Sequence, residues 1–375
     1  MPPSLPLISI IVGNYNYERF VGAAIDSALC QTYTNVEVIV IDDGSTDGSR
    51  ALLERYRDRV RLIFKDNGGP TTTIHAGWAA ARGDIVMFLD ADDRLCEDAA
   101  EKVAEAWRPD IVKVQFPLRV IDAGDRLQGF VPATIRPLDA AEIDRLVRRW
   151  GIYPTPPTTG NAYARRFLAA LLPLDLKRFP NGADGALNAV APLYGSVISL
   201  GRSLGYYRVH GRNLWAGAPL DVERFRAYIA VGRDEADFLK EHATRRGIRL
   251  SHADPLDHSL VFLERRLILK KLAPSDPLAR HDDALMLFFN ACRCIGTYER
   301  SPLRSALILA WFFIIATSFP AITKKLIAYR YVPQSRPTVI ARLAALVRRP
   351  SQPPLPSEAT PPLVTRVGKM EFIDP

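Results

Sequence analysis

The chain has 375 residues, 48% hydrophobic and 24% charged, as expected of a globular protein with the core of one large domain or two ordinary ones. Its net charge of +8 favours an anionic partner, and composition does not choose between a nucleotide, a phospholipid surface and a nucleic acid. Its four cysteines lack the spacing of a disulfide framework or of a paired zinc motif, which excludes a small secreted scaffold and favours a reducing, cytoplasmic setting.

Segments typical of strands and helices alternate over the first 116 residues. Apolar runs bounded by turn residues predict strands at 7–12, 36–41, 60–64, 85–89 and 111–116. Segments in which apolar residues recur with helical spacing lie between them, at 18–31, 47–58, 71–81 and 97–107. This alternation predicts an α/β fold with a largely parallel sheet covered by helices on both faces.

The pattern becomes less regular after residue 117. Residues 122–125 are typical of a hairpin turn. Three prolines make residues 153–160 irregular, as binding loops often are. Residues 221–291 have a charged, helical pattern.

An uncharged apolar run of seventeen residues, 306–322, precedes a basic stretch, 323–350, which has seven lysines and arginines and no acidic residue. The run is at the short end of a membrane-spanning helix and contains Pro320. A basic stretch beside an apolar run predicts association with a membrane surface. A buried helical hairpin followed by a solvated basic tail is the alternative. Residues 351–375 are rich in proline and are expected to be disordered.

Two acidic clusters follow two of the predicted strands. The first is Asp-Asp-Gly-Ser-Thr-Asp at 42–47, and the second is Asp-Ala-Asp-Asp at 90–93. Residues just past the carboxyl ends of strands line the ligand crevice of an open α/β sheet. Clustered carboxylates there are unfavourable without a compensating cation, so the pattern indicates a site for a metal and a phosphorylated ligand. Helix-capping turns are the alternative.

Taken in order, these segments resemble family 2 glycosyltransferases of the GT-A fold. The motifs that carry the resemblance are residues 9–16, 27–33, 40–47, 67–70, 83–84, 88–93 and 207–213. The resemblance covers residues 5–215. It implies a metal-dependent, inverting transfer of a sugar from a nucleotide-diphosphate-sugar to a hydroxyl of a saccharide or lipid-linked acceptor, in cell-surface polysaccharide or glycolipid synthesis.

The resemblance also implies the residues that hold the nucleotide. Gly13 and Tyr15 would flank the base, beside Asp42 and Asp43. The carboxylate of Asp43 would accept a charge-assisted hydrogen bond from the base. Arg208, in a late Arg-x-His element, would approach the diphosphate.

By the same resemblance, Asp90 and Asp92 would hold Mn²⁺ or Mg²⁺ together with the diphosphate, with His210 as a further ligand. An EF-hand is excluded, because Leu95 occupies the position that requires glycine. A structural role is the alternative for a single histidine such as His210.

The resemblance further implies that Asp184 is the general base, in the sequence Asn-Gly-Ala-Asp-Gly at 181–185. The family commonly has Glu-Asp here, whereas Ala183 precedes the aspartate in this chain. A helix-capping role for Asp184 is the alternative. Residues 74–75 are Ile-His where relatives often have Arg-Asn, which shifts the expected diphosphate contact to His75, Arg208 or Arg212.

The expected organisation has four parts. They are a GT-A domain at 1–215 (nucleotide-sugar half 1–105, acceptor half 106–215), a helical region at 216–300, an apolar and basic membrane-associating segment at 301–350, and the tail at 351–375. We expect a location at the inner face of the cell membrane and no nucleic-acid partner.

Other functions fit the sequence less well. A nicotinamide dehydrogenase is disfavoured because no Gly-x-Gly-x-x-Gly follows the first strand. A sugar nucleotidyltransferase is disfavoured because no glycine-rich phosphate loop with a lysine follows the first predicted strand. A catalytically inactive relative that only binds nucleotide-sugar or glycan would keep the acidic clusters and need no base, so it stays open.

Overall fold

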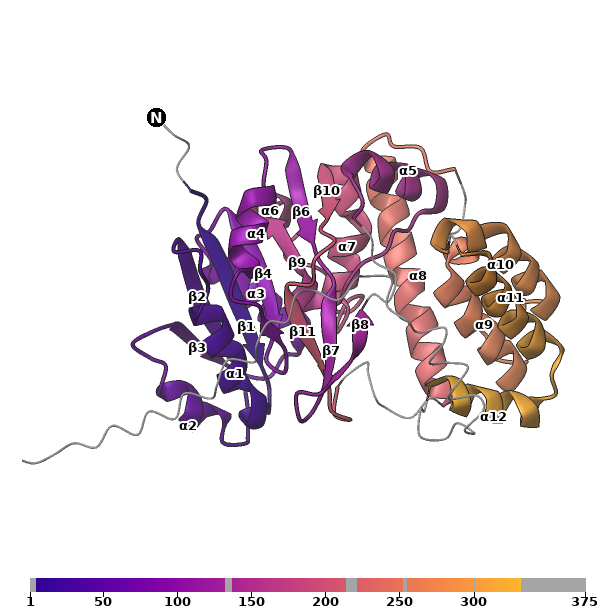
Figure 1. Ribbon diagram of the computed structural model, residues 1–375, viewed down its shortest axis with the longest axis horizontal. Coiled ribbons are helices and arrows are strands. Elements are labelled where there is room, and N and C mark those ends of the chain that lie inside the picture. Colours follow the sequence, from indigo (N-terminus) through magenta and orange to yellow (C-terminus); the bar gives the residue numbers. More distant parts are fainter. Residues whose placement is uncertain (1–4, 132–136, 214–220, 252–254, 300, 332–375) are drawn as a thin grey trace, which may run out of the picture. The chain divides into compact units, whose positions relative to one another are not determined.

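The computed structural model describes residues 5–131, 137–213, 221–251, 255–299 and 301–331 (Figure 1). By its contacts the chain divides into two compact units, Met1–Ile327 and Ala328–Pro375. The first unit holds the fold described below. The tail expected to be disordered, 351–375, and most of the basic stretch lie outside the described residues.

A seven-stranded sheet runs through the first unit in the order β10-β6-β9-β4-β1-β2-β3. Its strands are β1 (Ile8–Asn14), β2 (Val36–Asp43), β3 (Arg61–Lys65), β4 (Ile85–Asp90), β6 (Ile111–Gln115), β9 (Asn161–Ala164) and β10 (Ser196–Ser199). Neighbouring strands are parallel except that β9 is antiparallel to both β4 and β6. The predicted largely parallel sheet is therefore confirmed, and the reversed β9 comes from the segment after residue 117, in which strand and helix patterns do not alternate regularly.

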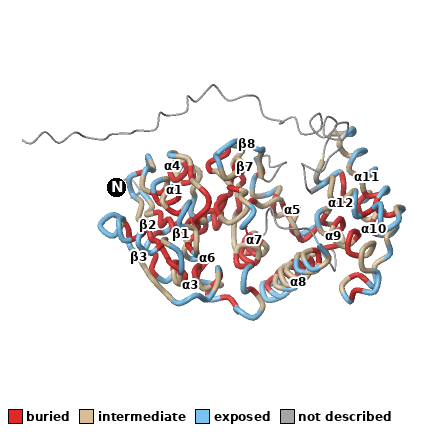
Figure 2. The backbone as a smooth tube through the Cα atoms, turned by 90° about the horizontal axis from the view of Figure 1, so that it is seen from below, coloured by how far each residue is buried: buried red, intermediate tan, exposed pale blue. Residues whose placement is uncertain are grey.

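Alternation along the strands divides the core between the two faces of the sheet. Strands β1 and β2 are themselves buried along most of their length (Figure 2). In β1, Ile8, Ile10 and Val12 pack on one side, and Ile11 packs on the other. The first side is covered by α1 (Glu18–Leu29), α2 (Ser49–Glu54) and α4 (Ala99–Ala106). The second is covered by α3 (Pro70–Ala80), α5 (Ala140–Trp150), α6 (Arg165–Ala169) and α7 (Ala183–Tyr194). Helices on both faces were predicted and are confirmed.

The helix expected at 47–58 is shorter than predicted. Helix α2 begins at Ser49, with Gly48 as its N-cap, and ends at Glu54 in a series of turns. The carboxylate of Asp47 accepts a hydrogen bond from the backbone N–H of Ser49 at 3.0 Å. The same carboxylate accepts another from Glu18 at 3.0 Å, so Asp47 also ties α2 to the start of α1.

A second, four-stranded sheet has the order β5-β11-β7-β8. Its strands are β5 (Arg94–Leu95), β7 (Leu118–Asp122), β8 (Leu127–Val131) and β11 (Gly205–Val209). The expected hairpin turn joins β7 to β8, with Asp125 at a positive φ of 66°. Because β11 pairs with β5, the late segment 205–213 lies next to the second acidic cluster.

The remaining described elements are helical. They are η1 (Thr158–Gly160), α8 (Val222–Arg245), η2 (Pro255–His258), α9 (Leu260–Leu272), α10 (Ala284–Tyr298), α11 (Pro302–Thr317) and α12 (Pro320–Tyr331). Helix α9 packs against α8, α10 and α11. The apolar run 306–322 is divided between two helices because Pro320 begins a new one. Within the described residues, no helix combines the length and the apolar character that crossing a bilayer requires.

Candidate active site

The carboxyl ends of β1, β2 and β4 meet at one edge of the large sheet. In the strand register, Gly13 lies opposite Asp90 of β4, and Asn14 lies opposite Asp42 of β2. A cavity of about 670 Å³ opens at this edge. Residues that line it include Gly13, Tyr15, Tyr17, Asp43, Thr73, Asp90, Asp92, Pro157, Thr158, Asn181, Asp184, Tyr207, Arg212 and Asn213.

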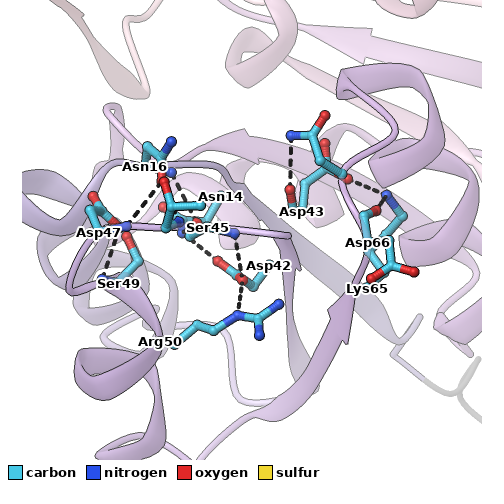
Figure 3. Close-up of polar contacts among 12 residues, drawn as sticks. Asn14, Asn16, Asp42, Asp43, Ser45, Asp47, Ser49, Arg50, Lys65 and Asp66 are labelled. Atoms are coloured by element: carbon cyan, nitrogen blue, oxygen red, sulfur yellow. Dashed lines mark hydrogen bonds and ion pairs between the residues drawn. The ribbon is translucent and has the colours of Figure 1, made fainter.

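Asp42 orders the loop after β2 and is not among the described residues that line the cavity. Its fully buried carboxylate accepts hydrogen bonds from Asn14 Nδ2 at 2.9 Å and from the backbone N–H of Ser45 at 3.1 Å (Figure 3). Arg50 Nε donates a third at 3.1 Å. The structure therefore places this predicted nucleotide contact behind the cavity, where it holds the two strand ends together.

Asp43 lines the cavity and fixes the turn that precedes α3. Its carboxylate accepts hydrogen bonds from the backbone N–H groups of Gly68 at 2.9 Å and Gly69 at 2.8 Å. It also forms an ion pair with Lys65 (Figure 3). These bonds hold an acidic group at the wall of the cavity, which also includes Tyr15, a residue that is 45% exposed.

Gly13 allows α3 to approach the end of β1 closely. A Cβ atom at this position would lie 2.9 Å from Thr73 Cγ2, so a larger residue would push α3 away from the sheet. Thr73 itself lines the cavity. The close packing of α3 on β1 therefore requires a glycine at residue 13, in addition to its predicted place beside the nucleotide.

The structure brings the second acidic cluster and the late segment together. Asp92 Oδ2 lies 3.0 Å from His210 Nε2 and accepts a hydrogen bond from Asn213 Nδ2 at 3.0 Å. The backbone N–H of His210 donates to Asn213 Oδ1 at 2.9 Å. The imidazole is packed between Tyr17 and Phe20, with ring centroids 5.4 and 4.9 Å away. The predicted proximity of His210 to the acidic pair is therefore observed.

Arg208 holds this arrangement from behind and is absent from the described lining of the cavity. Its side chain is 3% exposed, and Nε donates to the backbone oxygen of Asp92 at 2.8 Å. Nη1 donates to Asp125 Oδ1 at 2.7 Å. His75 also lies elsewhere, with Nε2 accepting a hydrogen bond from Leu174 at 3.0 Å. Of the three cations considered for the diphosphate, only Arg212 lines the cavity.

Asp90 has no cationic partner among the described ion pairs. Burial and the neighbouring charges of Asp92 and Asp184 raise its pKa to about 8. Mg²⁺ and Mn²⁺ prefer oxygen ligands such as these carboxylates, and a bound cation would relieve the repulsion between their negative charges. The described part of the chain contains no group of three or more His, Cys, Asp or Glu side chains arranged to hold a metal ion. A cation here would therefore need oxygens of its ligand to complete its coordination.

Asp184 lies in the first turn of α7 and faces the same cavity as Asp90. Thr158 Oγ1 donates to its Oδ2 at 3.3 Å. Burial raises the pKa of this carboxyl, and the buried ammonium of Lys113 acts in the opposite direction. The candidate base is thus a partly buried carboxylate with raised proton affinity, at the wall of the cavity that holds the acidic cluster.

Sequence reasoning missed several lining residues. Tyr17, Asn181 and Asn213 border the cavity. Asn181 and Asn213 lie inside the motifs at 181–185 and 207–213, so their positions could have predicted that they line the site. The segment 153–160, expected to be irregular and to form a binding loop, contributes Pro157 and Thr158 to the wall.

Comparison with known proteins identifies the family. Residues 9–151 match the family model for glycosyl transferase family 2. An uncharacterized glycosyltransferase of Nostoc sp. is 35% identical over 212 residues, covering 55% of this chain and 66% of the relative. An uncharacterized glycosyltransferase of Haemophilus influenzae is 44% identical over 103 residues, covering 26% of this chain and 41% of the relative. The chain therefore contains a glycosyl transferase family 2 domain, and the predicted resemblance to this family of glycosyltransferases is confirmed.

A solved structure supports the fold. S. aureus TarS, residues 1–349 in complex with UDP, matches with a TM-score of 0.50 and 17% sequence identity over 88% of this chain and 93% of TarS. At this identity the likeness concerns the fold alone. The chain spans about two thirds of the length of the Nostoc relative and less than half of the Haemophilus one.

Proposed function

We propose that this chain is a metal-dependent, inverting glycosyltransferase that uses a nucleotide-diphosphate-sugar. One observation carries the proposal: Asp43, Asp90, Asp92 and Asp184 line a single cavity at the ends of the parallel strands, together with Arg212. Ligands of open α/β sheets bind at this edge. The volume of about 670 Å³ is within the range of small-molecule sites.

The donor would be held by three groups of residues. The nucleotide base would lie by Gly13 and Tyr15, with Asp43 accepting a hydrogen bond from a ring N–H. The diphosphate would lie by Arg212, the cation among the described residues of the lining. Asp90 and Asp92 would hold Mn²⁺ or Mg²⁺, which neutralises charge that develops on a leaving diphosphate.

Asp184 would act as the general base of the transfer. The oxygen of the acceptor hydroxyl forms a bond to the anomeric carbon while the bond from that carbon to the diphosphate oxygen breaks. The electron pair of the broken bond leaves on the diphosphate, and Asp184 takes the proton from the hydroxyl. Thr158, which donates to Asp184 Oδ2, would orient the carboxylate.

The acceptor is proposed to be a hydroxyl of a saccharide or a lipid-linked saccharide at the inner face of the cell membrane. The cavity is bordered by Pro157 and Thr158 on the acceptor half of the predicted domain, which supports an acceptor approaching past this segment.

The substitution Asp184→Asn tests this function. We expect release of nucleotide from a panel of UDP-, GDP- and dTDP-sugars to fall about 100-fold or more, because the amide accepts no proton. UDP is the first nucleotide to test, because the TarS structure of similar fold holds it. Calorimetric binding of the nucleotide with Mn²⁺ should be retained. The control is Asp237→Asn, the same change at an exposed position of α8.

Two results would contradict the proposal. Turnover of D184N equal to that of D237N would reject Asp184 as the base. If the unsubstituted chain binds nucleotide but shows no turnover with any donor and acceptor extract, it is instead a binding protein that has lost catalysis.

A further inference from the structure

Helix α11 presents an apolar side to solvent. Its exposed positions between 303 and 314 recur every three or four residues, and none of them is polar. They are Leu303, Ala306, Leu307, Ala310, Phe313 and Ile314. Leu303 is 71% exposed and Phe313 51%. A helix at the surface of a soluble protein normally directs charged and polar residues to solvent, so this side lacks the expected polar face.

The apolar side continues onto α10. Leu285, Met286 and Phe289 of α10 are about half exposed. The ring of Phe289 lies 5.5 Å from that of Phe288, which lies 5.6 Å from that of Phe313. These three residues of α10 and the six of α11 are called the α10–α11 surface below.

The core of the protein does not cover this surface. Helices α10 and α11 pack on α9, which in turn packs on α8 (Figure 1). The α10–α11 surface is therefore composed of the residues that these helix contacts leave exposed (Figure 2). Contiguous exposed apolar patches of more than a few hundred Å² mark sites of association with proteins or membranes.

The charges around the surface favour an anionic partner. Residues 282–327 include five lysines and arginines and three acidic residues, Asp282, Asp283 and Glu299, and Asp282 is paired with Arg266. Arg304 lies 3.9 Å from the carboxylate of Glu299. Arg293, Lys324 and Lys325 are exposed. Two copies of the chain facing each other through this surface would bring like charges together, whereas anionic lipid headgroups would attract them.

We propose that the α10–α11 surface docks on a bilayer that contains anionic lipids, with its apolar side chains inserted at the level of the headgroups. The α11 helix has 16 residues, which gives a length of about 24 Å, less than the roughly 30 Å of the hydrocarbon core. The surface would therefore lie in the interface without crossing it. The inference deepens the proposed function, because it would bring the cavity to membranes that carry lipid-linked acceptors.

Vesicle sedimentation of the full chain tests the proposal. The probes are vesicles of phosphatidylcholine with phosphatidylglycerol and vesicles of phosphatidylcholine alone. We expect binding to the anionic vesicles, and a loss of at least about tenfold in L303E/L307E, since apolar insertion of two leucines is lost. The matched control is L127E/L176E, because these leucines are 58% and 44% exposed, close to 71% and 43% for Leu303 and Leu307, and lie outside the α10–α11 surface.

Further measurements separate the outcomes. L303S/L307S should also weaken vesicle binding. Because serine adds no charge, this result would show that the negative charge of the two glutamates does not by itself cause the loss of binding. Calorimetric binding of UDP with Mn²⁺ by the same variants reports on the cavity, so failure of the proposed donor site is seen independently of vesicle binding. Equal vesicle binding by L303E/L307E and the control would overturn the proposal. So would absence of binding to both kinds of vesicle, or a surface-dependent dimer in sedimentation velocity without vesicle binding.

Discussion

Neighbouring aspartates have different roles because side chains alternate along a strand. Asp42 and Asp43 are consecutive in β2, and consecutive strand residues point to opposite sides of a sheet. Asp42 is engaged by Asn14, Ser45 and Arg50, whereas the carboxylate of Asp43 is engaged by the turn before α3. The first therefore stabilises the strand ends, and the second supplies the acidic wall of the cavity.

The proposed role of Asp184 as the general base predicts how the rate of transfer depends on pH. Burial raises the pKa of its carboxyl above the ordinary value of 3.8. A general base acts in its ionised form, which is present above its pKa. We therefore expect kcat/KM to fall with unit slope as the pH decreases through the raised pKa. Measurement of kcat/KM between about pH 4 and 8 checks this, and a D184N profile that kept the same acidic limb would assign it to another group.

At the scale of elements, the approach of α3 to β1 shapes the cavity. Gly77 of α3 is buried against Ile11 of β1, and a Cβ atom at residue 77 would overlap Cγ2 of Ile11. The same helix carries Thr73, which lies close to Gly13. The distance between this helix and strand therefore sets both the packing of the core and the space at the strand end.

The substitution Gly77→Ala tests this contact. Forcing a methyl group into a packed helix–strand contact is expected to lower the free energy of unfolding by about 1–3 kcal/mol. The control is Gly296→Ala in α10, where a Cβ atom meets nothing within 4 Å. It should raise the free energy of unfolding by up to about 1 kcal/mol through helix propensity. Urea denaturation measures both, and equal effects would show that α3 does not pack tightly on β1.

At the scale of the whole molecule, ligand binding and stability are linked. A ligand at about 100 times its Kd stabilises a folded protein by about 2.7 kcal/mol. If a cation joins Asp90 to the diphosphate, Mn²⁺ with UDP should raise the melting temperature of the full chain more than UDP alone. Asp90→Asn should lose this cation-dependent increase, and its metal-free melting temperature should rise slightly, because like-charge repulsion is removed.

Thermal melting with and without Mn²⁺ makes the comparison. Asp58→Asn, the same change at an exposed turn after α2, is the control and should behave like the unsubstituted chain. A cation-dependent increase that D90N retains would show that Asp90 does not hold the metal.

The parallel sheet and its covering helices were predictable from the order of the residues alone, because apolar periodicity indicates which faces are buried. The sequence also predicted the membership of Asp43, Asp90, Asp92 and Asp184 in one group, although they span more than 140 positions, since strand ends and recognised motifs fix their approximate place. The roles assigned to these residues stay predictions.

Tertiary structure decided which side chains of those motifs reach the cavity. Arg208 points at the backbone of Asp92, 116 positions earlier, while Arg212 lines the cavity. The reversal of β9 and the burial of Asp42 were likewise undetectable along the chain. The physical reason is that periodicity encodes how far a residue is buried, whereas the direction of a polar side chain depends on partners that only the completed fold brings near.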